Sequence, residues 1–393
     1  MKKLKCLLFL TPLFLVACFH PPIPNVEEAA LNADPNTVIL LSNENTGDYF
    51  RAALPFQASS VRGLILNNIT NRADLEQIEM SMMRVATDYF DPEVVYFQEG
   101  QNLSREFVLN LLRLNQADPE FPFESAIGLN PSLGSSHVFG GRTFESTAED
   151  QIRPLIFLIE QNFITFDETE EAQLEGISIV LALNPYYREI DQSIGHDQTH
   201  RRTEEDLIAI GEEMASNLVP LLRERPGLEE VPILIGLFVL KPNNAVIPGH
   251  LASVAYVEAG RSSIQSFTDV HERHFSLPDP TNTLQNYVQS DDASIVGQFN
   301  DFRDAMINYF PFPNGIVSRV HLVNREVYRV SIVFNMHFSS ASERMAFFQL
   351  LEREITTFSD RYEIQVTVRS LEVNHGTVHR PAYGEVSVNM LNW

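Results

Sequence analysis

The sequence predicts an α+β protein made of two related α+β domains with mainly antiparallel sheets, preceded by a signal peptide and a flexible tether. Two kinds of apolar pattern indicate this fold class. Apolar residues recur at helical spacing in several segments, as between Leu207 and Leu221, whereas residues 362–368 alternate between apolar and polar side chains. The chain has 393 residues, of which 44% are hydrophobic, and this is enough for two domains with buried cores.

The first domain is expected at residues 46–195. Its residues 115–150 are rich in Pro, Gly, Ser and Asn, which predicts a long loop, and loops of that length are often functional. In chain order, the predicted elements are a helix through Leu75 to Tyr89, a strand at 94–97, a helix at 107–112 that Ser104 caps, the loop at 115–150, an apolar segment at 155–159 and a buried strand at 176–184 that Pro185 ends.

The second domain is expected at residues 196–393, because the pattern of elements changes near residue 195. An aromatic pair precedes proline at both 89–92 and 309–311, which favours two related halves, although this is also a common way to end a helix. The predicted elements are a helix from Thr203 that Pro220 kinks or ends, a buried strand at 231–240, a turn at 248–249, a helix through 295–306, strands at 317–323 and 327–336 with a hairpin loop at 324–326, a helix through 345–358 and a strand at 362–368.

The amino terminus has the order of residues that is typical of a signal peptide. Lys2, Lys3 and Lys5 precede an apolar run at residues 7–16. The run is much shorter than the roughly 20 residues that a membrane-spanning helix needs. We therefore expect residues 1–17 to direct export and then to be removed.

The apolar run ends in the pattern of a lipobox, Leu15, Val16, Ala17 and Cys18. We expect the sulfur of Cys18 to receive a diacylglyceryl group and the leader to be cleaved between Ala17 and Cys18. The membrane partner would then be the lipid on Cys18, which holds the protein on the extracellular face of the cell membrane. Residues 18–45 would form the tether. The alternative is an ordinary signal peptide with an unrelated cysteine near its end.

The composition excludes several functions. The formal net charge is −24, and it becomes −27 after removal of residues 1–17, which hold three lysines and no acid, so no nucleic-acid partner is expected. The same acidic surplus opposes docking on anionic lipid. Of the two cysteines, Cys6 leaves with the leader and Cys18 is lipidated, so neither a disulfide nor a cysteine-based metal site is expected.

Arginine supplies nearly all the positive charge of the mature chain, in which Lys241 is the one lysine. Arginine stays charged at a pH where lysine titrates. One interpretation is therefore an organism whose outer surface faces an alkaline medium. A bias in nucleotide composition is the alternative interpretation.

No segment has the pattern of a nucleophile elbow, a phosphate-binding glycine loop or a zinc-protease helix. We assign no catalytic residue, no metal ligand and no cofactor, and we expect a non-enzymatic body after the tether. The metal candidates considered are two histidine pairs, His196 with His200 and His271 with His274, which a helix would bring to one face. Asp197 or Glu272 would add an oxygen ligand, and solvated histidine is the alternative.

Two other groups of residues are candidates for binding. Gly140, Gly141 and Arg142 lie in the long loop and could bind an anion, or the glycines could simply make the loop flexible. Glu99 and Glu160 could line one surface, or each could be solvated or paired with arginine. Neither glutamate is assigned as a general acid or base.

Several short segments, taken in their order, resemble the CamS family of sex-pheromone lipoproteins. They are YFQEGQNL at 96–103, GLNP at 128–131, EQNF at 160–163, GISIVLALN at 176–184, VPI at 231–233 and PG at 248–249. The resemblance implies a lipoprotein of low-GC Gram-positive bacteria with two α+β repeats, here residues 46–195 and 196–393. It also implies that the discarded signal peptide yields a short apolar pheromone.

The resemblance places the candidate pheromone at the end of the leader, Thr11, Pro12, Leu13, Phe14, Leu15, Val16 and Ala17. Its partners would be a peptide importer and a receptor with an apolar groove in the recipient cell, and conjugative plasmid transfer would follow. Pro12 departs from the expected aliphatic pattern. Because almost every lipoprotein leader yields a similar fragment, an inert fragment is the alternative.

Three functions remain open for the body. It could interact with an unknown partner without catalysis, or it could capture a small molecule or peptide in a cleft between its domains. The third is an enzyme that acts on cell-envelope polymer, which would need converging carboxylates or a metal ion in one deep pocket.

Overall fold

The computed structural model describes most of the chain after residue 49. The predicted leader, Cys18 and the tether at 18–45 lie outside the described residues. Within the described ranges, no helix is long and apolar enough to cross a membrane. These ranges are 50–69, 71–116, 128–167, 171–191, 196–279, 282–289, 292, 294–310, 315–370 and 373–391.

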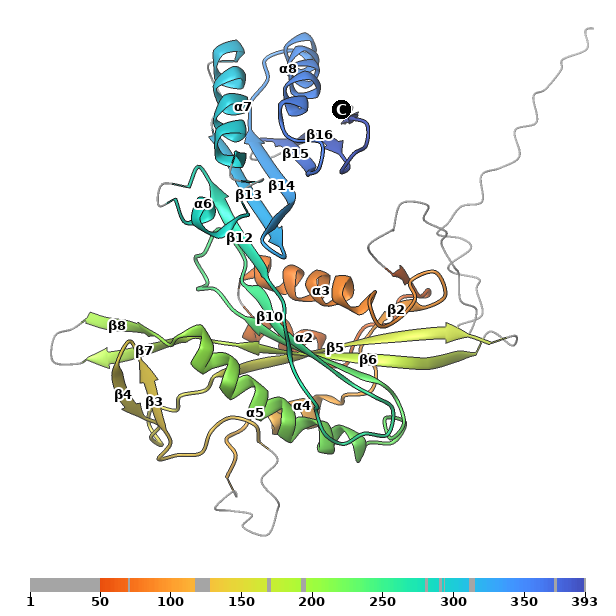
Figure 1. Ribbon diagram of the computed structural model, residues 1–393, viewed down its shortest axis with the longest axis vertical. Coiled ribbons are helices and arrows are strands. Elements are labelled where there is room, and N and C mark those ends of the chain that lie inside the picture. The colour runs from red at the N-terminus through yellow and green to blue at the C-terminus, as the bar shows by residue number, and fades with distance from the viewer. Residues whose placement is uncertain are drawn as a thin grey trace, which may run out of the picture.

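A seven-stranded mixed sheet forms the first half of the body (Figure 1). Neighbouring strands are antiparallel except β1 with β2 and β6 with β9, which are parallel. In their order across the sheet, the strands are β1 (Arg51–Ala52), β2 (Tyr96–Glu99), β5 (Leu155–Phe166), β6 (Ala172–Leu183), β9 (Ile233–Val239), β10 (His250–Val257) and β11 (Thr268–Asp269).

Helices cover both faces of this sheet, which explains why β9 is buried along its whole length. On one face, Met82 of α3 (Arg72–Ala86) lies over Gly236, where a side chain would find its sulfur at 2.9 Å. On the other face, Gly211 of α5 (Glu204–Arg223) lies against Leu237. Figure 1 shows α3 and α5 on opposite sides of β5 and β6. The other helices of this half are α2 (Arg62–Asn68) and α4 (Arg105–Leu111).

Polar side chains begin three of these helices, and at Ser104 and Thr203 the sequence predicts the start. Asn71, Ser104 and Thr203 each accept a hydrogen bond from a backbone N–H of the first turn. The predicted ends were less accurate. Helix α3 ends before Tyr89, and α5 continues beyond Pro220 for three residues to Arg223.

Two small hairpins accompany the first sheet. The loop predicted at 115–150 was partly wrong, because it contains β3 (Ser136–Phe139) and β4 (Arg142–Glu145), while residues 117–127 lie outside the described residues. Gly140 and Gly141 form the hairpin turn with φ of 55° and 82°, a conformation that favours glycine. The second hairpin is β7 (Tyr186–Asp191) with β8 (His196–Arg201), and aromatic rings join the two hairpins.

A six-stranded sheet forms the second half, and its strands follow one another in chain order. Only β14 and β15 are parallel among its described pairs. The strands are β12 (Glu272–Leu277), β13 (Gly315–Val323), β14 (Glu326–Asn335), β15 (Glu363–Arg369), β16 (Asn374–Arg380) and β17 (Ser387–Met390); the helices are α6 (Thr283–Tyr287), α7 (Ile295–Tyr309), α8 (Ala341–Glu354) and the 3-10 turn η2 (Ile355–Thr357).

Helices α7 and α8 lie on one face of the second sheet (Figure 1). Aromatic side chains pack between these helices and the sheet. Phe302 of α7 and Phe347 of α8 both pack on Phe334 of β14. Among the described residues of this half, no helix covers the other face, and polar residues such as Arg329 and Glu363 stand on it. This polar face is where the second half meets α3.

The α+β class with mainly antiparallel sheets is confirmed, but the boundary predicted near residue 195 does not match the division into sheets. Strands β6 and β9 lie on either side of that position and pair directly in one sheet. The chain passes from the first sheet to the second between Asp269 and Glu272.

Candidate functional site

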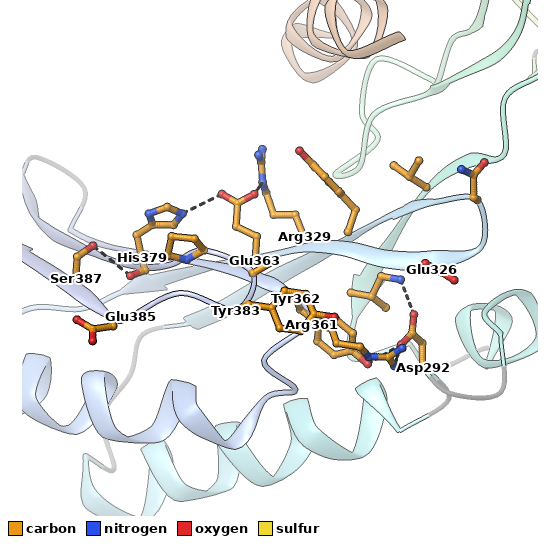
Figure 2. Close-up of a pocket in the computed structure, with 16 residues that line it drawn as sticks. Asp292, Glu326, Arg329, Arg361, Tyr362, Glu363, His379, Tyr383, Glu385 and Ser387 are labelled. Carbon is orange, nitrogen blue, oxygen red and sulfur yellow. Dashed lines mark hydrogen bonds and ion pairs between the residues drawn. The ribbon is translucent and has the colours of Figure 1, made fainter. Parts of the chain in front are cut away.

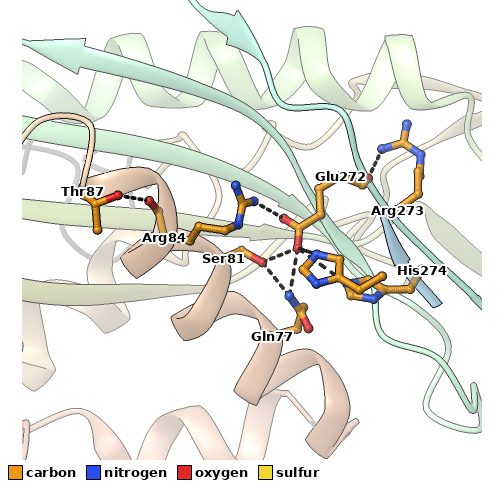
Figure 3. A network of polar contacts seen from close by, with 8 residues as sticks. Gln77, Ser81, Arg84, Thr87, Glu272, Arg273 and His274 are labelled. Carbon is orange, nitrogen blue, oxygen red and sulfur yellow. Dashed lines mark hydrogen bonds and ion pairs between the residues drawn. The ribbon is translucent and has the colours of Figure 1, made fainter. Parts of the chain in front are cut away.

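A buried polar cluster lies where the two halves meet, around Glu272 (Figure 3). The side chain of Glu272 is 0% exposed, and its Oε1 accepts hydrogen bonds from His321 Nε2 at 2.7 Å, Ser81 Oγ at 2.8 Å and Gln77 Nε2 at 2.9 Å. The second oxygen, Oε2, lies 3.3 Å from an Nη atom of Arg84. One carboxylate therefore joins α3 of the first half to strands of the second.

Local structure brings these side chains together. Gln77, Ser81 and Arg84 stand at helical spacing on one face of α3. Glu272 and His274 are two residues apart on β12 and share one face of the sheet. His321 is the direct partner of His274 in the antiparallel register of β12 and β13, and the two imidazole rings stack with centroids 4.3 Å apart.

The electrostatics of the cluster favour an ionised glutamate beside two neutral histidines. Burial alone raises the pKa of Glu272, but His274, His321 and Arg84 oppose this strongly, so its pKa lies well below its ordinary value. Burial lowers the pKa of His274 to about 3 and also lowers the pKa of His321. Neutral imidazole and ionised carboxylate are the forms that bind metal ions.

His274 is not satisfied by this network. Neither of its ring nitrogens makes a hydrogen bond, and its side chain is 1% exposed. Its Nε2 lies 3.6 Å from Oε1 of Glu272, which is too long for a hydrogen bond. Glu272, His274 and His321 each offer one ligand atom, and these atoms lie within 4.8 Å of one another.

A second candidate is an open cleft of about 920 Å³ on the second half (Figure 2). Glu363 stands at one end of β15 and accepts from Arg329 Nε at 2.7 Å on β14, and it lies 3.0 Å from His379 Nε2 on β16. The exposed ring of Tyr383 and the carboxylate of Glu385 complete this wall. The cleft therefore offers an aromatic face together with charges of both signs.

The opposite end of the cleft is fixed by Asp292, which is buried. Its Oδ1 accepts from Arg361 at 2.6 Å and from the Tyr362 hydroxyl at 2.9 Å, and its Oδ2 accepts from the Val327 N–H at 2.7 Å. Burial and this carboxylate raise the pKa of Tyr362 well above its ordinary value. These groups hold the shape of the cleft and leave Asp292 committed to its three donors.

The helix expected for the candidate pair His271 and His274 is not present. His274 lies on strand β12 and is buried, whereas His271, just before that strand, is exposed. The side chain of His196 lies outside the described residues, as does that of Asp197. His200 contacts Glu189, with Nε2 to Oε2 at 2.8 Å.

The other predicted binding residues have structural partners. Arg142 pairs with Glu189 at 3.2 Å. Glu99 accepts from the Ser59 N–H at 2.8 Å and pairs with Arg62 at 3.0 Å.

Glu160 is buried and does not line a surface with Glu99. It accepts from the backbone N–H groups of Asn102 and Leu103, both at 2.9 Å, and so fixes the loop before α4. Burial raises the pKa of Glu160, although these hydrogen bonds oppose the shift.

Sequence reasoning found Glu272 and His274 but missed His321, Arg84 and the whole cleft. Residues 274–277 alternate between polar and apolar side chains, and extension of this strand pattern back to residue 272 could have placed Glu272 and His274 on one face. His321 is 47 residues further along than His274, and only the register of β12 with β13 brings the two together.

The segments that carried the family resemblance lie together in the first half. Residues 96–99 pair with 161–164, and residues 155–166 pair with 172–183. Asn130, in the GLNP segment, is buried and exchanges hydrogen bonds with the backbone N–H and C=O of Leu155 at 2.9 and 3.0 Å. The resemblance therefore marks one continuous part of the fold.

The body is a two-sheet α+β protein. Its first sheet has seven strands and helices on both faces, and its second has six strands and helices on one face. Residues 56–385 match the family described as CamS sex pheromone cAM373 precursor. The chain belongs to this family, which confirms the resemblance found in the sequence. No curated protein sequence matches the chain.

Solved structures show the same fold. The crystal structure of a sex pheromone precursor from Lactobacillus salivarius subsp. salivarius UCC118 has a TM-score of 0.76 at 18% identity, over 91% of this chain and 100% of that chain. The structure of the C-terminal domain of the sex pheromone staph-cAM373 precursor from Staphylococcus aureus has a TM-score of 0.67 at 18% identity, over 83% of this chain and 99% of that chain.

Proposed function

We propose that this chain is an exported lipoprotein whose leader yields an apolar signalling peptide and whose folded body binds a ligand outside the cell without catalysis. Membership of a sex pheromone precursor family supports the first part and favours a secreted or surface location. Lipidation is supported by the lipobox at residues 15–18. The lipid would be the membrane partner, and a peptide importer and receptor in recipient cells would be the partners of the peptide.

The observation that carries the proposal is the thiol of Cys18 directly after a short apolar run. Two acyl chains on this sulfur would anchor the protein stably, whereas one chain would not. Cys18→Ser removes the sulfur with little change in size. We expect this variant to lose the acylated amino terminus in mass spectra and to leave the membrane fraction or keep its leader.

Cys6→Ser is the matched control, because it removes the other cysteine from within the leader. It should leave acylation and cleavage unchanged. A mature amino terminus at any residue other than an acylated Cys18, or an unchanged Cys18→Ser protein, would contradict lipidation.

The peptide is tested separately. Mass spectrometry of the culture medium should find the Thr11–Ala17 fragment for the parent chain and not for Cys18→Ser. A synthetic peptide of the same sequence, added at nanomolar concentration to plasmid-bearing responder cells, should induce clumping or transfer. The reversed sequence is the control, and silence in all suitable responders would reject pheromone activity.

For the body, the cleft of the second half is the binding site that the geometry supports best. His379 and Tyr383 are accessible in it, while Glu363 and Asp292 are held by neighbouring donors. These groups fit a polar ligand with both donors and acceptors, such as a peptide segment. The proposal favours binding over catalysis because the two least exposed carboxylates of the cleft, those of Asp292 and Glu363, already accept from neighbouring donors.

Native mass spectrometry of protein from its own cells tests this binding. We expect a copurified ligand mass on the parent chain and its loss from the His379→Ala, Tyr383→Ala double variant. Met345→Ala, at an exposed site on α8 outside the cleft, is the control. A parent chain without any bound mass, or a double variant that keeps it, would refute this site.

A further inference from the structure

We infer that Glu272, His274 and His321 form a binding site for one divalent transition-metal ion of the zinc type, which ties α3 of the first half to β12 and β13 of the second (Figure 3). The inference goes beyond the proposed function, because neither the leader peptide nor the cleft depends on it.

The donor set is two imidazoles and one carboxylate, which suits Zn²⁺ and neighbouring first-row ions and not Ca²⁺ or Mg²⁺. In a tetrahedral site with bonds of about 2.0–2.1 Å, ligand atoms stand roughly 3.3 Å apart. Here Oε1 of Glu272 lies 2.7 Å from His321 Nε2 and 3.6 Å from His274 Nε2. These two distances bracket the value for shared coordination. Because the two imidazole rings stack with centroids 4.3 Å apart, one ring would have to turn out of the stack to direct its Nε2 at the ion.

His274 is the observation that a hydrogen-bond network does not explain. An imidazole buried with both nitrogens unpaired leaves at least one polar group without compensation, which costs about 1–3 kcal/mol. Its Nε2 is the atom that faces Glu272 Oε1. A metal ion bound there would satisfy this nitrogen. His321 would carry its proton on Nδ1 and free its Nε2 for the ion.

The residues around the cluster are compatible with an ion. Arg84 contacts Oε2 of Glu272, so Oε1 would be the ligand atom, in place of the hydrogen bonds that it now accepts from His321, Ser81 and Gln77. The hydroxyl of Ser81 lies 2.8 Å from Oε1 and could supply a fourth ligand atom when its proton turns away. A cavity of about 70 Å³ borders the cluster and is lined by Gln77, Ser81 and His321. Its wall also carries Glu76 and three arginines, Arg84, Arg319 and Arg329.

The test uses the purified full-length chain, without a histidine tag, after removal of metal by a chelator. Zn²⁺ alone is added, and binding is measured by calorimetry and by elemental analysis after gel filtration. We expect one ion per chain, a dissociation constant below micromolar and a higher melting temperature. Cobalt(II) should give visible absorption bands of low-symmetry coordination.

Three variants separate a metal site from a structural network. His274→Phe fills the same space and should weaken zinc binding by roughly 100-fold or more, with loss of the cobalt bands. Glu272→Gln retains hydrogen bonding but removes the anionic ligand, and should weaken binding by roughly tenfold or more. His271→Ala, at the exposed neighbouring histidine, should bind as the parent does.

Two results would overturn the inference. One is a parent chain that takes up less than one zinc ion at micromolar concentration. The other is equal zinc affinity in the parent and in folded His274→Phe. In either case the cluster would be a hydrogen-bond network only, and the lipidation and peptide experiments would be unaffected.

Discussion

Arg223 connects the end of α5 to two loops of the first half, and its replacement by lysine should be costly. Its side chain is almost fully buried and donates to four backbone carbonyl groups. Nε reaches Arg261 O at 2.8 Å, Nη1 reaches Leu228 O and Val231 O at 2.6 Å each, and Nη2 reaches Glu258 O at 3.0 Å. Burial lowers the pKa of Arg223, with Glu230 opposing the shift.

Arg223→Lys keeps the charge but not the planar arrangement of donors. The single nitrogen of lysine cannot lie between carbonyl groups on several sides, so we take two of the four hydrogen bonds as lost. A hydrogen bond to a charged group contributes about 1.5–3 kcal/mol, so the free energy of unfolding should fall by about 3 kcal/mol or more. Arg223→Met, which leaves all four carbonyls without this donor, should be worse.

Urea unfolding followed by far-ultraviolet circular dichroism measures this difference. Arg153→Lys is the matched control in the same half, because Arg153 is exposed and its hydrogen bonds go to the nearby Gln151 side chain. The control should change stability by less than about 0.5 kcal/mol. If Arg223→Lys falls within the same range, the four carbonyl contacts do not stabilise the fold as argued.

Three further predictions concern single buried contacts. Burial and the nearby Arg202 lower the pKa of His137 from 6.5 to about 4, so the unfolded chain takes up a proton before the folded chain does as the pH falls. The free energy of unfolding should therefore decrease between pH 6.5 and 4, by up to about 3 kcal/mol. In urea titrations, His137→Gln should show a smaller dependence of stability on pH. In Gly176→Ala the new methyl group would overlap the Phe90 ring, with an expected loss of about 2 kcal/mol, and Phe90→Leu should restore part of it; purely additive losses would contradict this contact. Asp74 accepts hydrogen bonds from two backbone N–H groups in the connection between β9 and β10, at 2.6 and 3.0 Å. Asp74→Ala should therefore lower the free energy of unfolding by about 3 kcal/mol, measured by thermal unfolding. A loss below about 1 kcal/mol would contradict a stabilising role for these two contacts.

Local elements were predictable because local residues determine them. Polar caps such as Ser104 and Thr203 mark helix starts through side-chain hydrogen bonds within one turn. Residues 176–184 are apolar without alternation because helices cover both faces of their sheet. The domain boundary was not predictable in this way, because the parallel pairing of β6 with β9 joins segments separated by a hairpin and a helix.

The candidate sites depend on long-range register, which the sequence does not show. Glu272 and His274 were recognised as metal-binding residue types, but the assumed helix paired the wrong histidines. The third member, His321, is placed by β13, and Arg84 is placed by a helix of the other half. The cleft likewise combines Arg329, Glu363 and His379 from three strands.

The arginine content leads to a last prediction, on alkaline stability. Between pH 8 and 10 the arginines remain charged. Burial lowers the pKa of Lys241, so as the pH rises the unfolded chain keeps its lysine proton longer than the folded chain does. The titration of this lysine therefore does not lower stability in that range. Burial and Asp150 raise the pKa of Tyr187 from 10.0 to about 12, so this stabilisation is lost as the pH rises from 10 to 12. The melting temperature of the body should therefore stay level from pH 8 to 10 and fall above pH 10, less steeply in Tyr187→Phe. Unfolding between pH 8 and 10 would remove the alkaline interpretation and leave nucleotide composition as the reason for the arginines.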